Sequence, residues 1–481
     1  MIIERIRSLF TAQPRIEPSP EITADILKNY NNHRSSMTQP YACYAPLKNM
    51  YFGHYGKVGA CCYNRDHVLG VYPQQTIRQM WFGDKANQLR DSLKAYNFSS
   101  GCQDCMQQLV AGNFDGTKAK QYDTHRMNEN KFPSVLEFEL ENTCNLECIM
   151  CSGDYSSLIR TKREKRAELP KPYDDEFIRQ LEEFIPYLQE VKFYGGEPFL
   201  IQSYYKIWDK IIELNPDVRV SVQTNGTTLN SRVKEILQKT NFHISVSLDS
   251  LNKERYELIR RNSNFDTVMD NLKYFHAYCR ERNTFFGIST CLMQQNWFEA
   301  PDFIRFCNSL DVQVYFHTVL YPDFTSLRQW SRGKLKEVYN VLAAQLDGLP
   351  EETAVQKKNK KHYHDFILQL LEWSYKHNAN PITEDIDSIE ELLAFLTKLT
   401  TERTDIDEAQ KKVSLEKITR NLEELARILP PDASIREMVK NIDPRDENQI
   451  KRLLDSAENG AAEEAVAYLK MKSNEWMYDK K

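Results

Sequence analysis

"VLEFELENTCNLECIMC" (residues 135–151) joins a short strand-like run to three closely spaced cysteines. Its first residues alternate between apolar and acidic side chains, a pattern typical of a β-strand. Cys144, Cys148 and Cys151 follow, without a fourth cysteine in the same stretch. Closed zinc sites and ordinary iron–sulfur clusters use four protein ligands, whereas a catalytic metal site keeps one position open. The three thiols therefore predict either a four-iron cluster with an open position or a zinc site completed by a distant His or Cys.

The residues that follow alternate between helix-like and strand-like runs. Amphipathic patterns such as residues 175–189 separate five further β-rich runs, at 190–195, 218–225, 243–250, 285–293 and 312–319. Six strands separated by helices predict an α/β fold with a parallel sheet, either open and doubly wound or an incomplete barrel. Ligands bind at the C-terminal ends of the strands in both folds, and Cys144 comes about four residues after the first strand.

A second group of cysteines precedes the strands. It consists of Cys43, Cys61, Cys62, Cys102 and Cys105. The spacing offers four ligands to one further metal centre, which suits a zinc ribbon as well as an iron–sulfur cluster. Because Cys61 and Cys62 are adjacent, the spacing leaves open which of the two is a ligand.

The composition is typical of a globular protein of several domains. The 481 residues have a net charge of −5, which does not favour non-specific binding of nucleic acid. Apolar runs do not reach the roughly 18–20 residues that span a bilayer, and charges interrupt the apolar N-terminus, unlike a signal peptide. We therefore expect a cytoplasmic protein, in which eleven cysteines favour metal or redox chemistry over disulfides.

Changes in composition along the chain predict five segments. They are a leader and linker (1–40), a cysteine-rich domain (41–110), a polar connector (111–132), the strand–helix domain (133–345) and a helical region (346–481). The helical region is charged and poor in glycine, and it has no cluster of chemistry-bearing residues. Docking of a peptide and dimerisation are both open as its role.

Two motifs together resemble the radical S-adenosylmethionine (SAM) superfamily. The Cys-x3-Cys-x2-Cys signature of that family matches Cys144, Cys148 and Cys151. Its Gly-Gly-Glu-Pro motif follows the second strand and stands here as Gly195, Gly196, Glu197 and Pro198. The resemblance implies a partial (β/α)6 TIM-like barrel, a catalytic [4Fe-4S] cluster on three cysteines, and SAM bound at the open iron.

The resemblance also implies which residues hold SAM at its amino-acid end. The glycine pair lets the backbone approach the amino group closely, and Glu197 offers an acceptor. Ser247, two residues before the Asp of the fourth strand, and Arg260 in the next helix would recognise the carboxylate, with Arg261 as the neighbouring alternative.

Two further positions complete the implied SAM site. Asn225 ends the third strand in the motif "QTNG" (residues 223–226). Met150 precedes the third cysteine, where the family often has an aromatic residue that contacts adenine. Methionine keeps an apolar contact there and loses stacking.

The early cysteines are similar to the first half of a SPASM domain, the "Twitch" form, which holds one auxiliary [4Fe-4S] cluster. The family element Cys-x(9–15)-Gly-x4-Cys fits Cys43, Gly56 and Cys61, and Cys102 and Cys105 complete the ligand set. The glycine spacing favours Cys61 over Cys62. Better-known relatives place this module after the barrel, whereas it comes first here.

The implied reaction is reductive cleavage of SAM to a 5′-deoxyadenosyl radical, which removes a hydrogen atom from a substrate. A flavodoxin or ferredoxin would supply the electron. A peptide or protein side chain is the first expectation for the substrate, and a sugar or nucleotide derivative is the second. A non-catalytic iron–sulfur scaffold is the alternative from another class. Cys291 and His317, near two strand ends, are considered as hydrogen or proton donors, and neither is assigned.

Overall fold

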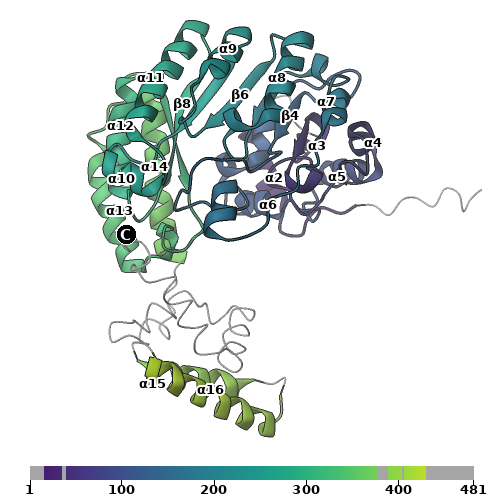
Figure 1. Cartoon of the computed structure of the whole chain (residues 1–481). Coiled ribbons are helices and arrows are strands. Elements are labelled where there is room, and N and C mark those ends of the chain that lie inside the picture. Colours follow the sequence, from purple (N-terminus) through teal and green to yellow (C-terminus); the bar gives the residue numbers. More distant parts are fainter. Residues whose placement is uncertain (1–15, 35–39, 377–387, 404–405, 429–481) are drawn as a thin grey trace, which may run out of the picture. The chain divides into compact units, whose positions relative to one another are not determined.

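The computed structural model describes residues 16–34, 40–376, 388–403 and 406–428. The chain forms two compact units, Met1–His317 with Pro350–His362 and Thr318–Leu349 with Tyr363–Lys481. Within these ranges, nine strands form one sheet, and they are β1 (Asn49–Phe52), β2 (Lys57–Gly59), β3 (Gly70–Val71), β4 (Val135–Phe138), β5 (Glu190–Phe193), β6 (Arg219–Thr224), β7 (Phe242–Ser247), β8 (Phe286–Leu292) and β9 (Gln313–Thr318). The sheet is drawn in Figure 1.

The helices of the first unit are α2 (Ala24–Asn32), α3 (Ala45–Lys48), α4 (Ile77–Phe82), α5 (Asp84–Lys94), α6 (Gln103–Val110), α7 (Asp175–Leu181), α8 (Gln202–Leu214), α9 (Ser231–Lys239), α10 (Lys253–Ile259), α11 (Phe265–Arg282) and α12 (Ala300–Ser309). The remaining described helices are α13 (Arg332–Leu346), α14 (Ala354–Lys376), α15 (Ile389–Glu402) and α16 (Glu408–Ile428).

The strand order is β3-β2-β1-β4-β5-β6-β7-β8-β9. All six predicted strands are confirmed as β4 to β9, and neighbours from β4 to β8 pair in parallel. The predicted α/β class is therefore confirmed. The described sheet is open, with β3 and β9 at its two edges, as in an incomplete barrel.

The cysteine-rich segment adds three strands to the same sheet. β1 pairs in parallel with β4, and β2 and β3 continue outward from β1 in antiparallel pairs. The sheet therefore runs across the predicted boundary between segments 41–110 and 133–345. Because β1 and β4 are parallel, their C-terminal ends lie at the same edge of the sheet. We call this edge the C-terminal rim.

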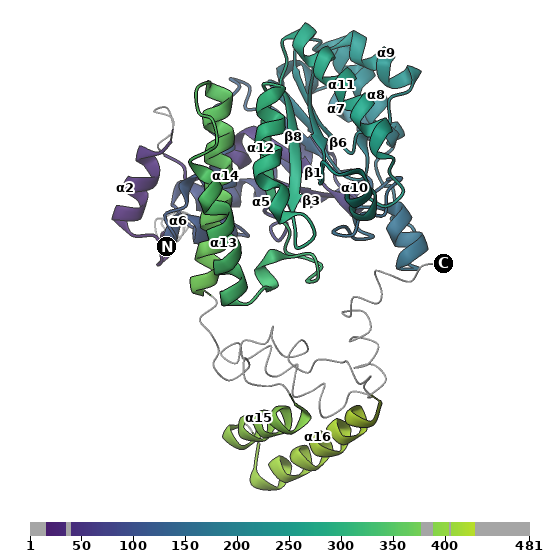
Figure 2. The same ribbon diagram turned by 90° about the vertical axis from the view of Figure 1, so that its left-hand side faces the viewer.

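The two faces of the sheet differ in chemistry. On β6, the side chains of Val220, Val222 and Thr224 are buried, whereas Arg219 and Gln223 are exposed although the strand is internal. Helices α8, α9 and α11 lie along one face of the sheet (Figures 1 and 2), which buries the alternate apolar residues. The opposite face is thus lined by polar side chains.

The aromatic core between sheet and helices centres on Trp208 of α8. Its side chain is fully buried, and its ring centroid lies 5.3 Å from those of Phe193 and Phe242. This contact attaches α8 to the end of β5 and to the start of β7 and so fixes the helix against the sheet.

β9 lies at one edge of the described sheet, and side chains of α14 form hydrogen bonds with backbone groups along its outer side. The Val314 N–H donates to Asn359 Oδ1 at 2.9 Å, and Asn359 Nδ2 donates to the Val312 carbonyl at 2.9 Å. His362 Nδ1 lies 2.6 Å from the Val314 carbonyl oxygen. These contacts satisfy groups that would otherwise pair with another strand.

The predicted helical region is confirmed where the structure describes it. α15 begins with a capping box formed by Ser388 and Glu391, and it packs against α16. The part of the predicted helical region after residue 428 and half of the predicted leader lie outside the described residues. Within the described ranges, we find no helix that is long and apolar enough to cross a membrane.

The Asn359 cap leads to a stability prediction. Asn359→Ala leaves the buried Val314 N–H of β9 and the Val312 carbonyl just before the strand without this partner, so we expect the free energy of unfolding to fall by about 1–3 kcal/mol. Urea denaturation of the full chain measures this change. Lys358→Ala, at the exposed neighbouring position, is the control. An equal effect of both variants would contradict the capping role.

Candidate metal centres and SAM site

The cysteine triplet lies on the loop that follows β4, at the C-terminal rim. Cys148 is buried, and Cys144 and Cys151 are partly buried. Burial raises the pKa of all three thiols, and the charges of Cys144 and Cys151 raise the pKa of Cys148 further. Metal binding would release these protons, because thiolates are the ligands of iron and zinc. The donor set therefore suits a soft metal centre.

The glycine pair after β5 allows this loop to approach the sheet. Gly195 and Gly196 have φ values of +78° and +27°. A Cβ atom on Gly196 would lie 2.2 Å from the Thr143 carbonyl oxygen, and one on Gly195 would lie 2.7 Å from that of Glu141. Only glycine fits at this contact. From the sequence, we predicted that these glycines let the backbone approach a ligand. In the structure, they let the loop after β5 approach the backbone of the cysteine loop.

Glu197 joins the ends of neighbouring strands. Its side chain is fully buried, and its carboxylate accepts hydrogen bonds from Thr224 Oγ1 at 2.7 Å, the Asn225 N–H at 2.7 Å and the Phe199 N–H at 3.1 Å. Its own N–H donates to the Thr143 carbonyl at 2.8 Å. Burial raises the pKa of this carboxyl, and the three donors oppose the shift. The predicted contact of Glu197 with the SAM amino group stays a prediction.

Asn225 brings the end of β6 to the triplet. Its Nδ2 group donates to Asn145 Oδ1 at 3.0 Å and lies 3.9 Å from Cys144 Sγ. Its Oδ1 atom accepts from the Thr227 N–H at 2.9 Å. Pro198 is buried in the turn after Glu197. The motifs that are far apart in the sequence thus meet at one place on the rim.

Arg260 is buried beside the triplet and pairs with a carboxylate that the sequence analysis did not assign. Its Nε atom lies 2.7 Å from Asp249 Oδ2, and both side chains are at most 8% exposed. The charge of Arg260 opposes the burial-induced rise in the pKa of Cys148. Asp249 therefore holds the guanidinium in place. The only sequence signal for Asp249 was its position two residues after Ser247.

The other predicted rim residues lie nearby in the fold. Ser247 ends β7 and is 9% exposed, and Met150 is partly buried in the cysteine loop. Cys291, at the end of β8, donates its N–H to Asp249 Oδ1 at 2.7 Å. Burial raises the pKa of the Cys291 thiol, and Arg260 opposes this shift. Cys291 thus belongs to the Asp249–Arg260 group.

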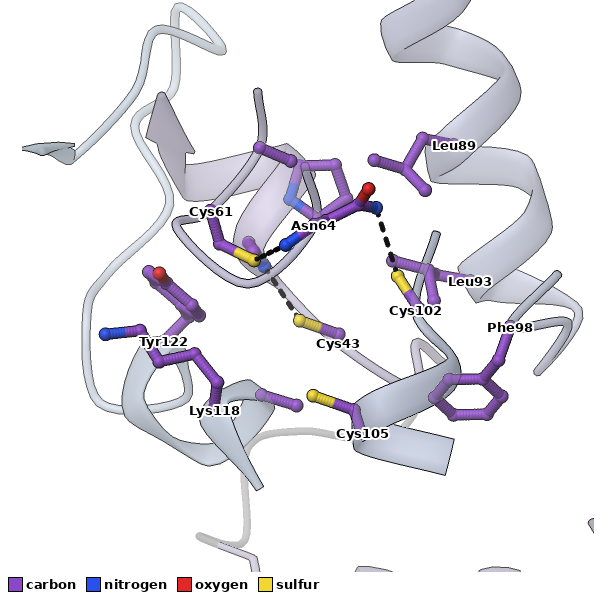
Figure 3. A pocket seen from close by; sticks show the side chains of 14 residues that line it. Cys43, Cys61, Asn64, Leu89, Leu93, Phe98, Cys102, Cys105, Lys118 and Tyr122 are labelled. Carbon is purple, nitrogen blue, oxygen red and sulfur yellow. Dashed lines mark hydrogen bonds between the residues drawn. The ribbon is translucent and has the colours of Figure 1, made fainter. Parts of the chain in front are cut away.

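The early cysteines line one cavity in the N-terminal part of the sheet unit. Cys43, Cys61, Cys102 and Cys105 all contribute to its wall (Figure 3), together with Asn64, Lys118 and Tyr122. Cys62 is not among the lining residues. Burial raises the pKa of Cys62 to about 11, and its charged neighbours include Glu137 and Lys118. The geometry therefore favours Cys61, as the glycine spacing did.

The cavity already provides hydrogen bonds to its sulfur atoms. The Ala45 N–H donates to Cys43 Sγ at 3.3 Å. Asn64 donates through its backbone N–H to Cys61 Sγ at 3.4 Å and through Nδ2 to Cys102 Sγ at 3.3 Å. Such bonds stabilise cysteine ligands and tune the potential of iron–sulfur clusters. The four thiols and their donors fit an auxiliary cluster.

Arg65 bridges the two cysteine-bearing segments. Its Nε atom donates to the Cys62 carbonyl at 3.0 Å, Nη1 donates to Tyr155 Oη at 3.0 Å, and Nη2 donates to Glu139 Oε2 at 3.0 Å. Tyr155 follows the triplet by four residues, and Glu139 follows β4. Arg65 is a functional candidate that sequence reasoning missed, because its three partners are up to 90 residues away in the chain.

Across the part of the chain that the structure describes, no three His, Cys, Asp or Glu side chains form a ready-made site for a single metal ion. Ligation of an iron–sulfur cluster by either cysteine group is therefore a proposal.

Three thiols at the rim of a parallel sheet and a four-thiol cavity beside it define a protein built for iron–sulfur chemistry. Comparison with protein families supports this iron–sulfur chemistry. Residues 139–307 match the radical SAM superfamily, and residues 43–106 match the SPASM iron–sulfur cluster-binding domain. The chain thus carries a radical SAM domain and an iron–sulfur cluster-binding domain. These two domains imply a catalytic [4Fe-4S] cluster, an auxiliary cluster and binding of SAM.

The curated relatives include enzymes that act on a nucleotide. The chain is 32% identical over 143 residues to the probable GTP 3′,8-cyclase of Methanocella arvoryzae, covering 29% of this chain and 42% of the relative. It is 26% identical over 236 residues to the GTP 3′,8-cyclase of Aquifex aeolicus, covering 46% and 69%. The chain thus spans 42% and 69% of the length of these two relatives.

Solved structures similar to this chain include "Native anSMEcpe with bound AdoMet", with a TM-score of 0.34, 18% identity, and coverage of 44% of this chain and 62% of that one. They also include Streptococcus suis SuiB bound to the precursor peptide SuiA, with a TM-score of 0.33, 18% identity, and coverage of 50% and 52%.

The network around Glu197 leads to a second prediction. In Glu197→Gln, an amide NH2 group replaces one acceptor oxygen and faces an N–H or O–H donor. We expect the free energy of unfolding to fall by about 1–3 kcal/mol. Chemical denaturation measures it, with Glu281→Gln on the exposed surface of α11 as the control. Unchanged stability of Glu197→Gln would show that the carboxylate does not hold the strand ends.

Proposed function

We propose that this chain reductively cleaves SAM and uses the resulting radical to remove a hydrogen atom from a substrate. The observation that supports it best is the meeting of Cys144, Glu197 and Asn225 at one point of the rim. When bound at the triplet, a [4Fe-4S] cluster supplies the electron that splits SAM into methionine and a 5′-deoxyadenosyl radical. The protein itself binds and orients SAM and the substrate, and it excludes water from the site.

The residues of the rim have separate tasks in this proposal. Cys144, Cys148 and Cys151 would hold the catalytic cluster, which would keep one position open for SAM. Arg260, fixed by Asp249, has Nη groups with which to bind the carboxylate, and Ser247 assists. The backbone of Gly195 and Gly196 with the carboxylate of Glu197 holds the amino group. Met150 contacts the adenine.

The four-thiol cavity would hold the auxiliary cluster in the same proposal. Cys43, Cys61, Cys102 and Cys105 occupy every iron, so this cluster has no coordination position for a substrate. Its role is then electron transfer or shaping of the substrate pocket. Because such clusters are sensitive to oxygen, a reducing cytoplasm suits the protein, and an electron carrier such as a flavodoxin or ferredoxin completes the reaction.

A peptide or protein side chain is the proposed substrate. Two observations support it. Four cysteines line the auxiliary cavity, so a cluster held by all four would leave no coordination position for a small substrate. Gln223 of an internal strand is exposed on the polar face of the sheet. A nucleotide is the second candidate, favoured by the relatives named GTP 3′,8-cyclase. Production of 5′-deoxyadenosine stimulated by GTP, with no response to a peptide fraction, would replace the first candidate by the second.

Cys144→Ala tests the reaction itself. After anaerobic reconstitution, dithionite and SAM are added and 5′-deoxyadenosine is quantified by chromatography. We expect formation by the wild type and none by Cys144→Ala, because one ligand of the catalytic cluster is gone. Cys307→Ala, which removes a buried thiol outside both groups, is the control. If the wild type binds the cluster and does not cleave SAM, the result would favour the alternative of a non-catalytic iron–sulfur scaffold.

The adjacent thiols give a matched pair of variants for the auxiliary cluster. The wild type is expected to bind about eight irons, corresponding to two four-iron clusters. Cys61→Ser should lower this content to about four irons, whereas Cys62→Ser should keep it, because only Cys61 lines the cavity. Iron and sulfide analysis of reconstituted protein measures the difference. The opposite order would assign the ligand to Cys62.

A further inference from the structure

The segment directly after the triplet covers the cysteine loop. The Cys144 N–H donates to Ser157 Oγ at 3.2 Å, and Ser156 Oγ donates to the Leu146 carbonyl at 2.7 Å. A π-helical turn, Ile159–Arg163, follows. At its end, Arg163 Nη2 donates to the Cys151 carbonyl at 2.6 Å. Residues 156–163 are therefore bonded to the loop at both of their ends.

The same segment presents positive charge to solvent. Residues 160–166 read RTKREKR and contain five basic side chains and one glutamate, in a chain whose net charge is −5. Lys162, Lys165 and Arg166 are exposed. Among the described residues, Lys162 and Lys165 have no ion-pair partner, whereas Arg166 pairs with Asp154 and Glu164. We call residues 160–166 the basic segment.

Electrons need a route to the triplet that does not pass through the SAM site. In the proposed function, SAM and the substrate occupy the rim side of the cluster, and that side must exclude water. The basic segment follows the cysteine loop in the chain, and its lysines are exposed to solvent. Arg163 connects it to the carbonyl of Cys151 through one hydrogen bond, so a donor bound here would be close to a cluster ligand.

We propose that the basic segment is the docking surface for an acidic one-electron carrier protein. This inference rests on the proposed function. Complementary charge raises the association rate of such partners and is well suited to brief encounters. In the transfer, the reduced carrier loses one electron and the catalytic cluster gains it, and no bond or proton is exchanged. An acidic substrate peptide or a nucleic acid is the competing occupant of a basic surface.

The test uses Lys162→Glu/Lys165→Glu in the full reconstituted chain. Both side chains are exposed and lack ion pairs in the described structure, so the substitutions reverse charge without breaking a contact. Lys28→Glu/Lys85→Glu, on the exposed surfaces of α2 and α5, is the matched control with the same change in charge. Cleavage of SAM is driven either by a reduced flavodoxin or by dithionite, which needs no protein docking.

We expect the flavodoxin-driven rate to fall about tenfold and the Kd for oxidised flavodoxin to rise about tenfold, while the dithionite-driven rate stays unchanged. High salt should remove the difference between the variant and the wild type. The control variant should behave as the wild type in every measurement.

Three results would overturn the proposal. Equal losses with both reductants would mean that the lysines support the cysteine loop, and an unchanged flavodoxin Kd would place docking elsewhere. A loss confined to binding of an acidic peptide or nucleic acid would assign the segment to that partner. Absence of dithionite-driven cleavage by the wild type would instead refute the proposed function, and the flavodoxin Kd would still decide the docking surface.

Discussion

The buried carboxylate of Glu197 is the contact on which the site depends. It joins the end of β5 to the end of β6 through Thr224 and Asn225, and its backbone N–H holds the loop after β4 at Thr143. A buried carboxylate is stable only when its oxygens accept hydrogen bonds, so the three strand ends cannot separate without leaving it unpaired. Cys144 and Asn225 are neighbours because of this constraint.

A second constraint is the parallel pairing of β1 with β4. It makes the cysteine-rich segment part of the radical SAM sheet, although the segment precedes that domain in the sequence. Tyr122, which lines the four-thiol cavity, donates to Glu137 Oε1 on β4 at 3.1 Å. Arg65 then connects the same segment to Glu139 and Tyr155. The two cysteine groups are therefore positioned by the same pair of strands.

The cysteine loop meets two groups of residues with different chemistry. Towards the rim it meets Glu197, Asn225 and the Asp249–Arg260 pair, which are buried and hydrogen-bonded or ion-paired. Through Arg163 it also meets the basic segment, whose lysines are exposed. Buried, ordered groups suit binding of a small cofactor, whereas exposed charges suit a transient protein partner.

The sequence by itself determined the six strands, the helices between them and the two cysteine groups. These features come from periodicity and short spacings, which are local properties of the chain. The rim motifs came from the resemblance to the radical SAM superfamily. Tertiary structure decided the pairing of β1 with β4, the partner of Arg260, and the capping of β9 by Asn359. Each of these unites residues whose distance in the chain gives no pattern, because contacts between distant segments depend on how the whole sheet packs.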